Sequence, residues 1–123
     1  MKKLLFVLSI VAMLSLLAAP ALAAGDMTCD HGGATMDPIE SLHHCVMHAY
    51  DMGHITNAGV ANSLMAKLDA AQAAFDRGQT DVAINPLNAF INEVGAQSGK
   101  SIVADHAGHL VMHAQMATMA LGG

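Results

Sequence analysis

Aromatic residues and positive charges are both scarce in this chain of 123 residues. It contains no Trp, one Tyr and three Phe, and its five Lys and Arg face ten Asp and Glu, so its formal net charge is −5. So few aromatic rings leave little lining for a porphyrin, which disfavours a haem protein. An acidic chain with few cations also argues against nucleic acid and anionic lipid as partners, because Lys and Arg dominate binding to both.

The chain also lacks the local motifs of the common enzyme classes. It has no His-Glu-x-x-His, no Gly-x-Ser-x-Gly, no phosphate-binding loop and no Cys-x-x-Cys. Its acidic residues are scattered and do not follow the spacing of a calcium-binding loop, which disfavours calcium and magnesium. We therefore expect a binding protein and not an enzyme.

The N-terminal residues have the pattern of a secretory signal peptide. Two lysines precede an apolar run, and Ala21-Leu22-Ala23 supplies the small residues of a cleavage site. The run is long enough for a single membrane anchor to be the alternative. Pro20 and the polar residues that follow the cleavage site favour cleavage after Ala23.

Cleavage divides the chain into a signal peptide at 1–23, a short flexible segment at 24–36 and a helical domain at 37–123. No second apolar run of spanning length follows the first, so we expect no membrane segment after cleavage and a periplasmic location. The mature protein would keep three Lys and Arg against all ten acids, a formal net charge of −7. Such a charge is compatible with attracting metal cations.

Helical periodicity continues through residues 37–123, and no alternation typical of strands is present. The apolar spacing predicts helices at 37–53, 57–77, 80–97 and 103–121. Short connections between four helices predict an all-α fold, an antiparallel four-helix bundle in which the first and last helices are neighbours.

Individual residues make this assignment specific. Asp37 and Pro38 have the types expected at a helix start, and Thr80 is expected to cap the third helix. Tyr50 is expected to face inward with the aliphatic residues of the first helix. Pro86 falls about two turns inside the third helix, where it should kink the helix or shift its start.

Several segments between residues 55 and 94 have a distinctive sequence. They are Ile55–Leu64, Lys67–Ala74 with Arg77 and Gly78, Ala83–Asn85, and Leu87–Val94. These segments resemble the FIMAH domain, a small helical module often appended to larger secreted bacterial proteins. The resemblance extends to Leu121, and it implies a helical fold and an extracytoplasmic setting but no established activity.

Two departures from the family pattern separate this chain from the module it resembles. Pro86 stands where the family usually has a helix-compatible polar residue. The first and last helices, ordinarily aliphatic and acidic in the family, are rich in His and Met here. The resemblance therefore implies a shared scaffold, to which this chain adds its own potential metal ligands.

Seven of the eight histidines lie in two short stretches, residues 42–54 and 105–113. Imidazole, thioether and thiolate together are the ligands of a soft or borderline transition metal, above all copper. Histidine and methionine recur at helical spacing in both stretches, so each helix presents a row of ligands on one face. The candidate metal ligands are His44, Cys45, Met47 and His48 in the first helix, His106, His109, Met112, His113 and Met116 in the last, and Cys29 and His31 in the segment 24–36.

The two cysteines allow two interpretations. In an oxidising compartment an even pair usually forms a disulfide, and Cys29–Cys45 would connect the N-terminal segment to the first helix. The alternative is that both are thiolates bound to a soft metal. A place for Cys45 in the core is a third interpretation, because it lies beside the apolar stripe.

The sequence therefore predicts a periplasmic protein that binds copper and buffers it or delivers it to another protein, such as a metal exporter or a copper-receiving partner. Zinc or nickel bound by the histidines alone is one alternative. A metal-free interaction module, which the FIMAH resemblance alone implies, is the other. Isolated histidines on helices are more often surface residues than ligands, so the prediction depends on the ligands converging in the fold.

Overall fold

Four helices form the part of the chain that the computed structural model describes, residues 37–123. They are α1 (Pro38–Asp51), α2 (Ala58–Asp76), α3 (Thr80–Gln97) and α4 (Ala104–Ala120). The predicted signal peptide, the segment 24–36, Cys29 and His31 lie outside the described residues. The four predicted helices are confirmed, with ends within a few residues of the expected ones.

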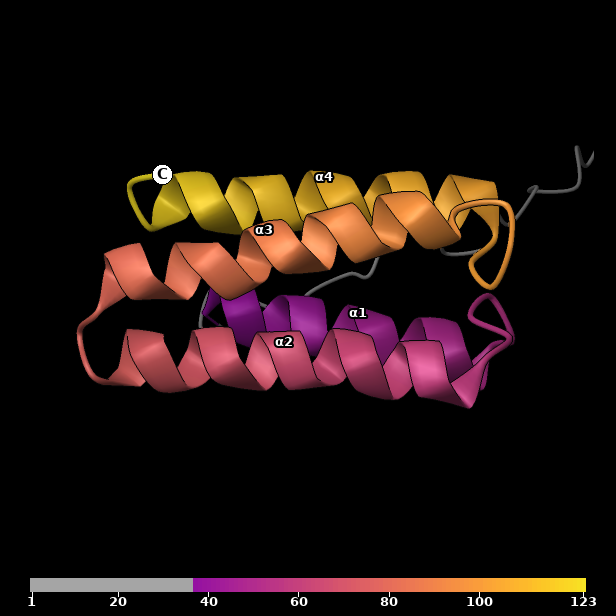
Figure 1. Ribbon diagram of the computed structural model, residues 1–123, viewed down its shortest axis with the longest axis horizontal. Coiled ribbons are helices and arrows are strands. Elements are labelled where there is room, and N and C mark those ends of the chain that lie inside the picture. The colour runs from indigo at the N-terminus through magenta and orange to yellow at the C-terminus, as the bar shows by residue number, and fades with distance from the viewer. Residues whose placement is uncertain (1–36) are drawn as a thin grey trace, which may run out of the picture.

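The helices lie side by side as an antiparallel bundle (Figure 1). Each helix packs against the next one along the chain, and α1 packs against α4, which closes the ring. The all-α fold and the contact between the first and last helices are therefore confirmed. Because α1 and α4 are the two helices rich in His and Met, their contact brings the two histidine-rich stretches next to each other.

The helix ends follow from local sequence. Asp37 Oδ1 accepts hydrogen bonds from the backbone N–H groups of Ile39 and Glu40, at 2.9 and 2.8 Å, and so caps α1. Asn57 Oδ1 caps α2 in the same way through the N–H of Val60. The prediction that Thr80 caps α3 is wrong, because Thr80 is the first helical residue and the cap position carries no side-chain hydrogen bond.

Pro86 lies inside α3 and does not shift its start, because the helix already begins at Thr80. A proline lacks the N–H that would donate to the carbonyl four residues earlier, which is that of Val82. Val82 is exposed and Pro86 is half-buried, so the proline lies near the surface of the bundle, and α3 continues past it to Gln97.

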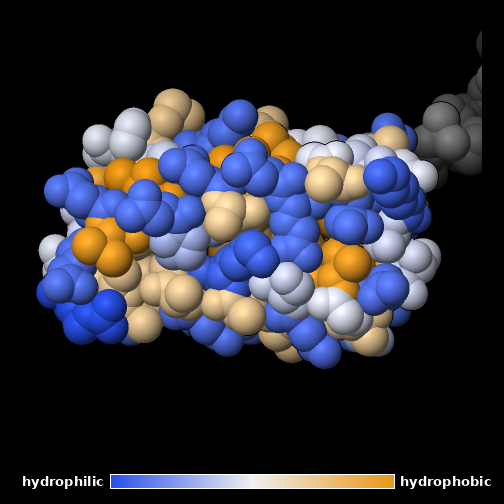
Figure 2. Space-filling model, in the orientation of Figure 1, coloured by the Kyte–Doolittle hydropathy of each residue, from blue (hydrophilic) through white to orange (hydrophobic). Residues whose placement is uncertain are grey.

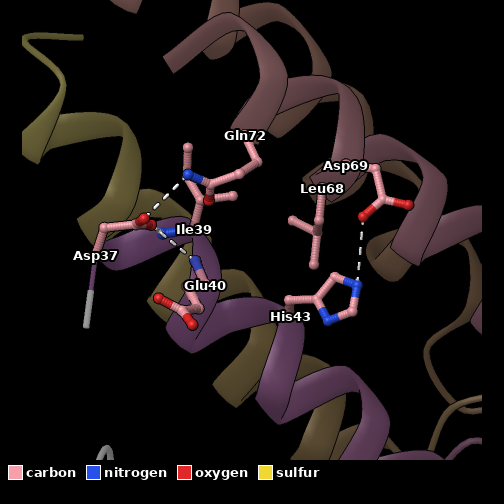
Figure 3. Close-up of a pocket in the computed structure, with 7 residues that line it drawn as sticks. All are labelled: Asp37, Ile39, Glu40, His43, Leu68, Asp69 and Gln72. Atoms are coloured by element: carbon pink, nitrogen blue, oxygen red, sulfur yellow. Dashed lines mark hydrogen bonds and ion pairs between the residues drawn. The ribbon is translucent and has the colours of Figure 1, made fainter. Parts of the chain in front are cut away.

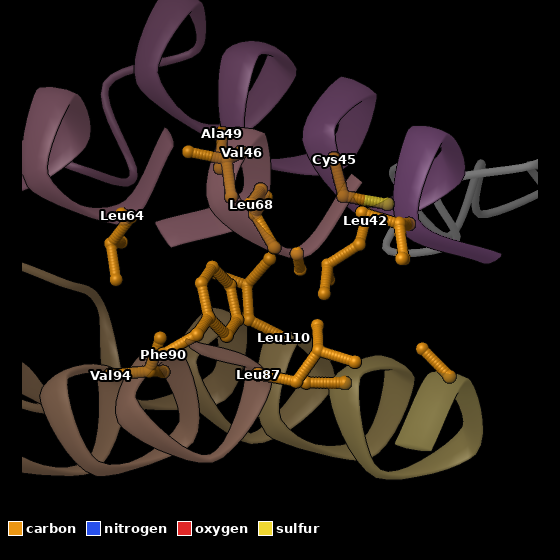
Figure 4. Close-up of a cluster of buried hydrophobic side chains, with 14 of the residues drawn as sticks. Leu42, Cys45, Val46, Ala49, Leu64, Leu68, Leu87, Phe90, Val94 and Leu110 are labelled. Carbon is orange, nitrogen blue, oxygen red and sulfur yellow. The ribbon is translucent and has the colours of Figure 1, made fainter. Parts of the chain in front are cut away.

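The core consists of aliphatic residues around the ring of Phe90 (Figure 4). Every helix contributes to it, and Leu42, Leu68, Leu87 and Leu110 are among the buried side chains. Eight buried alanines complete the core, and their small side chains allow close approach of the helices. Tyr50 was expected here but is largely exposed, because Ala49 takes the inward position and the next residue points about 100° away from it.

The α1–α2 and α3–α4 loops pair with each other at one end of the bundle. Ile55 and Ile102 form an antiparallel bridge, and both side chains are completely buried. The N–H of Thr56 donates to the carbonyl of Ser101 at 2.9 Å, and the N–H of Val103 donates to the carbonyl of His54 at 2.9 Å. This pairing fixes the end of α1 relative to the start of α4.

On the face shown in Figure 2, small apolar patches are interspersed with polar residues. No helix within residues 37–123 combines the length and the apolar character needed to cross a membrane. Exposed methionines account for several of the apolar surface residues of the bundle, on α1 and on α4.

Candidate functional site

Four histidines from three elements lie near one another at the end of the bundle that the paired loops close. His48 lies in the last turn of α1, His54 in the α1–α2 loop, and His106 and His109 in the first two turns of α4. We call them the histidine cluster. The rings of His54 and His106 are stacked, with centroids 3.6 Å apart and an angle of 16° between their planes. His109 meets His106 edge to face, with centroids 6.4 Å apart.

The fold places His54 in the cluster through backbone hydrogen bonds. Gly53 adopts a positive φ of 79° and ends α1, after which the N–H of His54 donates to the carbonyl of Ala49 at 2.8 Å. The carbonyl of His54 then accepts the N–H of Val103, the residue before α4. His106 follows three residues later, so its ring lies against that of His54.

The electrostatics of the cluster favour the neutral imidazole of His106. Burial lowers the pKa of His106 below its usual range, and the neighbouring rings of His54 and His109 lower it further. Asp105 has the opposite effect on this pKa, and His48 adds a small lowering. Neutral imidazole is the form that binds metal ions, so His106 is in its binding form at neutral pH.

A second group of candidate ligands lies along the outer side of α4. It consists of His109, Met112, His113 and Met116, and we call it the α4 ligand face. The side chains of Met112 and Met116 are 47% and 45% exposed, and the two histidines are half-buried. Spacings of three and four residues place the four side chains next to one another on one face of the helix.

The candidate ligands of α1 separate into exposed and buried residues. His44, Met47 and His48 are exposed. Cys45 is completely buried, and Figure 4 shows its side chain among the core residues near Leu42. The structure therefore places Cys45 in the core and not with the exposed imidazoles. Its predicted partner Cys29 lies outside the described residues, so the disulfide stays a prediction.

Within residues 37–123, no three or more His, Cys, Asp or Glu side chains are grouped in a way that could hold a metal ion. The stacking of His54 and His106 accounts for this in part, because the rings present their faces and not converging nitrogen atoms to each other. A metal ion bound in the cluster would need these two rings to turn. The cluster therefore groups candidate ligand side chains without forming a coordination sphere.

His54 is a member of the cluster that sequence reasoning did not select. It follows a helix-ending glycine, and a histidine in that position is ordinarily a turn residue. Its place in the cluster depends on the pairing of two loops that are almost fifty residues apart. Neither loop has a sequence pattern that predicts this pairing. The only indication in the sequence is its place in the first histidine-rich stretch.

A pocket of about 330 Å³ lies on the opposite flank of α1, against α2 (Figure 3). His43 Nε2 lies 3.4 Å from Asp69 Oδ1 at one end of this pocket. At the other end, Gln72 Nε2 donates to Asp37 Oδ2 at 3.0 Å. Both contacts join α1 to α2. We therefore assign these residues to helix packing. His43 belongs to the same histidine-rich stretch but lies outside the cluster, so it can serve as a control residue.

Comparison with known proteins identifies the scaffold. The family model of the FIMAH domain matches residues 39–117, which is more than half of the chain. The match begins in α1 and ends in α4, so it includes all four helices and the whole histidine cluster. No curated protein and no solved structure matches the chain.

Proposed function

This chain belongs to the FIMAH domain family, and we propose that it binds copper through the histidine cluster and the α4 ligand face. The observation that carries the proposal is the stacking of His54 on His106, with His48 and His109 beside them. These residues are up to 61 positions apart in the sequence, as from His48 to His109. Imidazoles from three elements thus lie near one another, which is a first condition for a metal site.

A role in core packing does not explain why these four histidines are grouped. The bundle already has a complete aliphatic core, and the cluster lies outside it. Stacked imidazoles repel each other once both are protonated, so this contact is a poor way to stabilise the fold. Turning the rings of His54 and His106 would direct their nitrogen atoms at an ion about 2.0 Å away. His54 lies in a loop, where such a rotation disturbs no helix.

Copper is favoured over zinc and nickel because of the thioethers. Met112 and Met116 adjoin His109 and His113 on an exposed surface, where methionine has no packing role. Thioether ligands select Cu(I), whereas imidazole accepts copper, zinc and nickel alike. We accordingly propose that the protein buffers copper or delivers it to a partner protein. FIMAH is an extracytoplasmic type of module, and together with the signal-peptide pattern it supports a periplasmic location.

Metal content and affinity test this function directly. The protein is purified with and without copper in the growth medium and titrated with Cu(II), Zn(II) and Ni(II), and with Cu(I) under a reductant. We expect copper to bind most tightly and the variant His54→Ala/His106→Ala to lose at least about tenfold in Cu(II) affinity, since even outer partners of a metal site are worth that much. The control His43→Ala removes an imidazole from the other flank of α1 and should bind like the wild type.

Other results would favour the other functions. Equal affinity of both variants would show that the cluster is not the site. Tight binding of zinc or nickel without preference for copper would indicate a site made by histidine alone. If the purified protein binds none of the four ions, the FIMAH bundle is a metal-free interaction module.

A further inference from the structure

We infer that the candidate ligands form two sites that sort copper by oxidation state: an imidazole site for Cu(II) at the closed end of the bundle, and a thioether-containing site for Cu(I) on the outer side of α4. This inference rests on the proposed function. It adds that no single ion is bound by the whole ligand set, and it assigns each oxidation state to particular residues.

Distance along α4 separates Met116, at the far end of the α4 ligand face, from the closed end of the bundle. The helix is continuous from Ala104 to Ala120, and Met116 follows His106 by ten residues. These residues are therefore about 15 Å apart along the helix axis, at 1.5 Å per residue. Two ligands that share one ion reach over about 13 Å at most, counting two side chains and two metal bonds of about 2.0 Å. The stacked pair His54 and His106 thus cannot share an ion with Met116.

The two groups also differ in chemistry. His48, His54 and His106 at the closed end are imidazoles, which suit Cu(II) as well as Cu(I). The α4 ligand face joins two thioethers to two imidazoles, and thioether prefers Cu(I). Both sulfur atoms belong to half-exposed side chains that can rotate toward an ion, whereas the opposite side of α4 is buried in the core.

His109 lies at the junction of the two groups. Its ring meets His106 edge to face, and it precedes Met112 by three residues, so it neighbours both sites. We assign it to both. Replacing His109 should therefore weaken Cu(II) and Cu(I) together, while replacing residues on either side of it should weaken one ion only.

Paired titrations of the full-length protein test the sorting. Cu(II) binding is followed by electron paramagnetic resonance, which reports nitrogen ligands, and Cu(I) binding by competition with a chromophoric chelator under anaerobic reducing conditions. The variants are His54→Ala/His106→Ala for the closed end and Met112→Leu/Met116→Leu for the outer face. Leucine keeps the volume and helix propensity of methionine, so the second variant should fold normally. Met65→Leu, a half-buried methionine on α2, is its control.

We expect the two variants to have opposite effects. The histidine variant should lose at least about tenfold in Cu(II) affinity and keep Cu(I) affinity within about twofold, and the methionine variant should do the reverse. His109→Ala should weaken binding of both ions, and Met65→Leu should weaken neither. His54→Asn, which alters a loop residue alone, replaces the double histidine variant if circular dichroism shows that the latter is unfolded.

Equal losses of both ions in both variants would overturn the inference and indicate one shared site. So would a Cu(I) affinity that is insensitive to the methionine variant. These outcomes leave copper binding intact and refute the sorting alone. If the wild-type protein binds neither ion, the proposed function fails instead, and the sorting with it.

Discussion

The α2–α3 half of the bundle and the α1–α4 half use polar side chains in different ways. Between α2 and α3, Lys67 Nζ contacts Ser63 Oγ at 3.0 Å and forms an ion pair with Glu93, and Ser63 Oγ donates to Glu93 Oε2 at 2.9 Å. The polar groups there satisfy one another. In the histidine cluster, where the end of α1, the α1–α2 loop and the start of α4 come together, the polar side chains are all imidazoles, and His54 and His106 lie face to face.

Under the proposed function, this difference separates stability from metal binding within one small domain. A closed network of complementary groups fixes two helices and offers nothing to a ligand. A cluster of similar donors gains little from its own members and much from an ion that all of them can bind. We therefore expect the contacts between α2 and α3 to contribute to stability alone, and the exposed side chains of α1 and α4 to contribute to the proposed binding. Three substitutions or conditions test this division.

The largest expected effect is that of Phe90→Ala. The ring is completely buried at the centre of the core, so its removal leaves a cavity and should destabilise the protein by about 3–5 kcal/mol. That is a large fraction of the stability of a domain of this size. Urea unfolding followed by circular dichroism measures the loss. Met116→Ala, which truncates an exposed side chain on α4, should cost less than about 1 kcal/mol. Similar losses in the two variants would contradict the division.

An intermediate effect is expected from Glu93→Ala. It removes the acceptor shared by Ser63 and Lys67 in a half-buried contact between α2 and α3, which should cost about 1 kcal/mol. Copper affinity should not change. Urea unfolding and a copper titration of the same sample measure both quantities. A change in copper affinity without a loss of stability would show that the α2–α3 half contributes to binding after all.

The smallest effect is the response of the metal-free protein to acid. Because the pKa of His106 is lowered in the folded state, the unfolded chain takes up the proton more readily. This contribution leaves stability unchanged above the usual histidine pKa of about 6.5 and reduces it as the pH falls from there toward the lower folded pKa. Urea unfolding between about pH 7.5 and about pH 5 measures the decline.

The substitution His106→Gln should make this decline smaller, whereas His43→Gln should leave the pH dependence as in the wild type. An identical decline in all three proteins would show that the imidazole contacts at the closed end do not contribute to it. A free energy of unfolding that rises on acidification would contradict a lowered pKa of His106 in the folded protein.

Local signals in the sequence were sufficient to predict the helices. Asp37, Asn57 and the positive-φ glycines Gly53 and Gly78 begin and end helices through hydrogen bonds within a few residues, so they can be recognised without knowing the fold. The FIMAH resemblance in helices two and three, confirmed by the family match, reflects the same local regularity. Tyr50 was wrongly predicted to face inward, because helical periodicity gives the centre of the buried face but not the residues at which that face ends.

The candidate site was predicted in part. His48, His106 and His109 were selected from their spacing, and the contact of α1 with α4 brings them to one place. Their meeting with His54 depends on the bridge between Ile55 and Ile102, a pairing of two loops whose residues carry no strand-like pattern. The orientation of the imidazole rings could not be predicted either, since the spacing of histidines along a helix does not show whether their rings stack or point their nitrogen atoms at one place. Longer-range contacts decide both features.

The bridge between the two loops also makes separation of these loops measurable by amide hydrogen exchange. The amide hydrogens of Thr56 and Val103 are held by carbonyls of the opposite loop and not by a helix. They can exchange with solvent when the loops separate, while the four helices stay intact. An ion that ties His54 to α4 would hold the loops together, so the exchange of these two amides should slow before any change appears in the rest of the backbone.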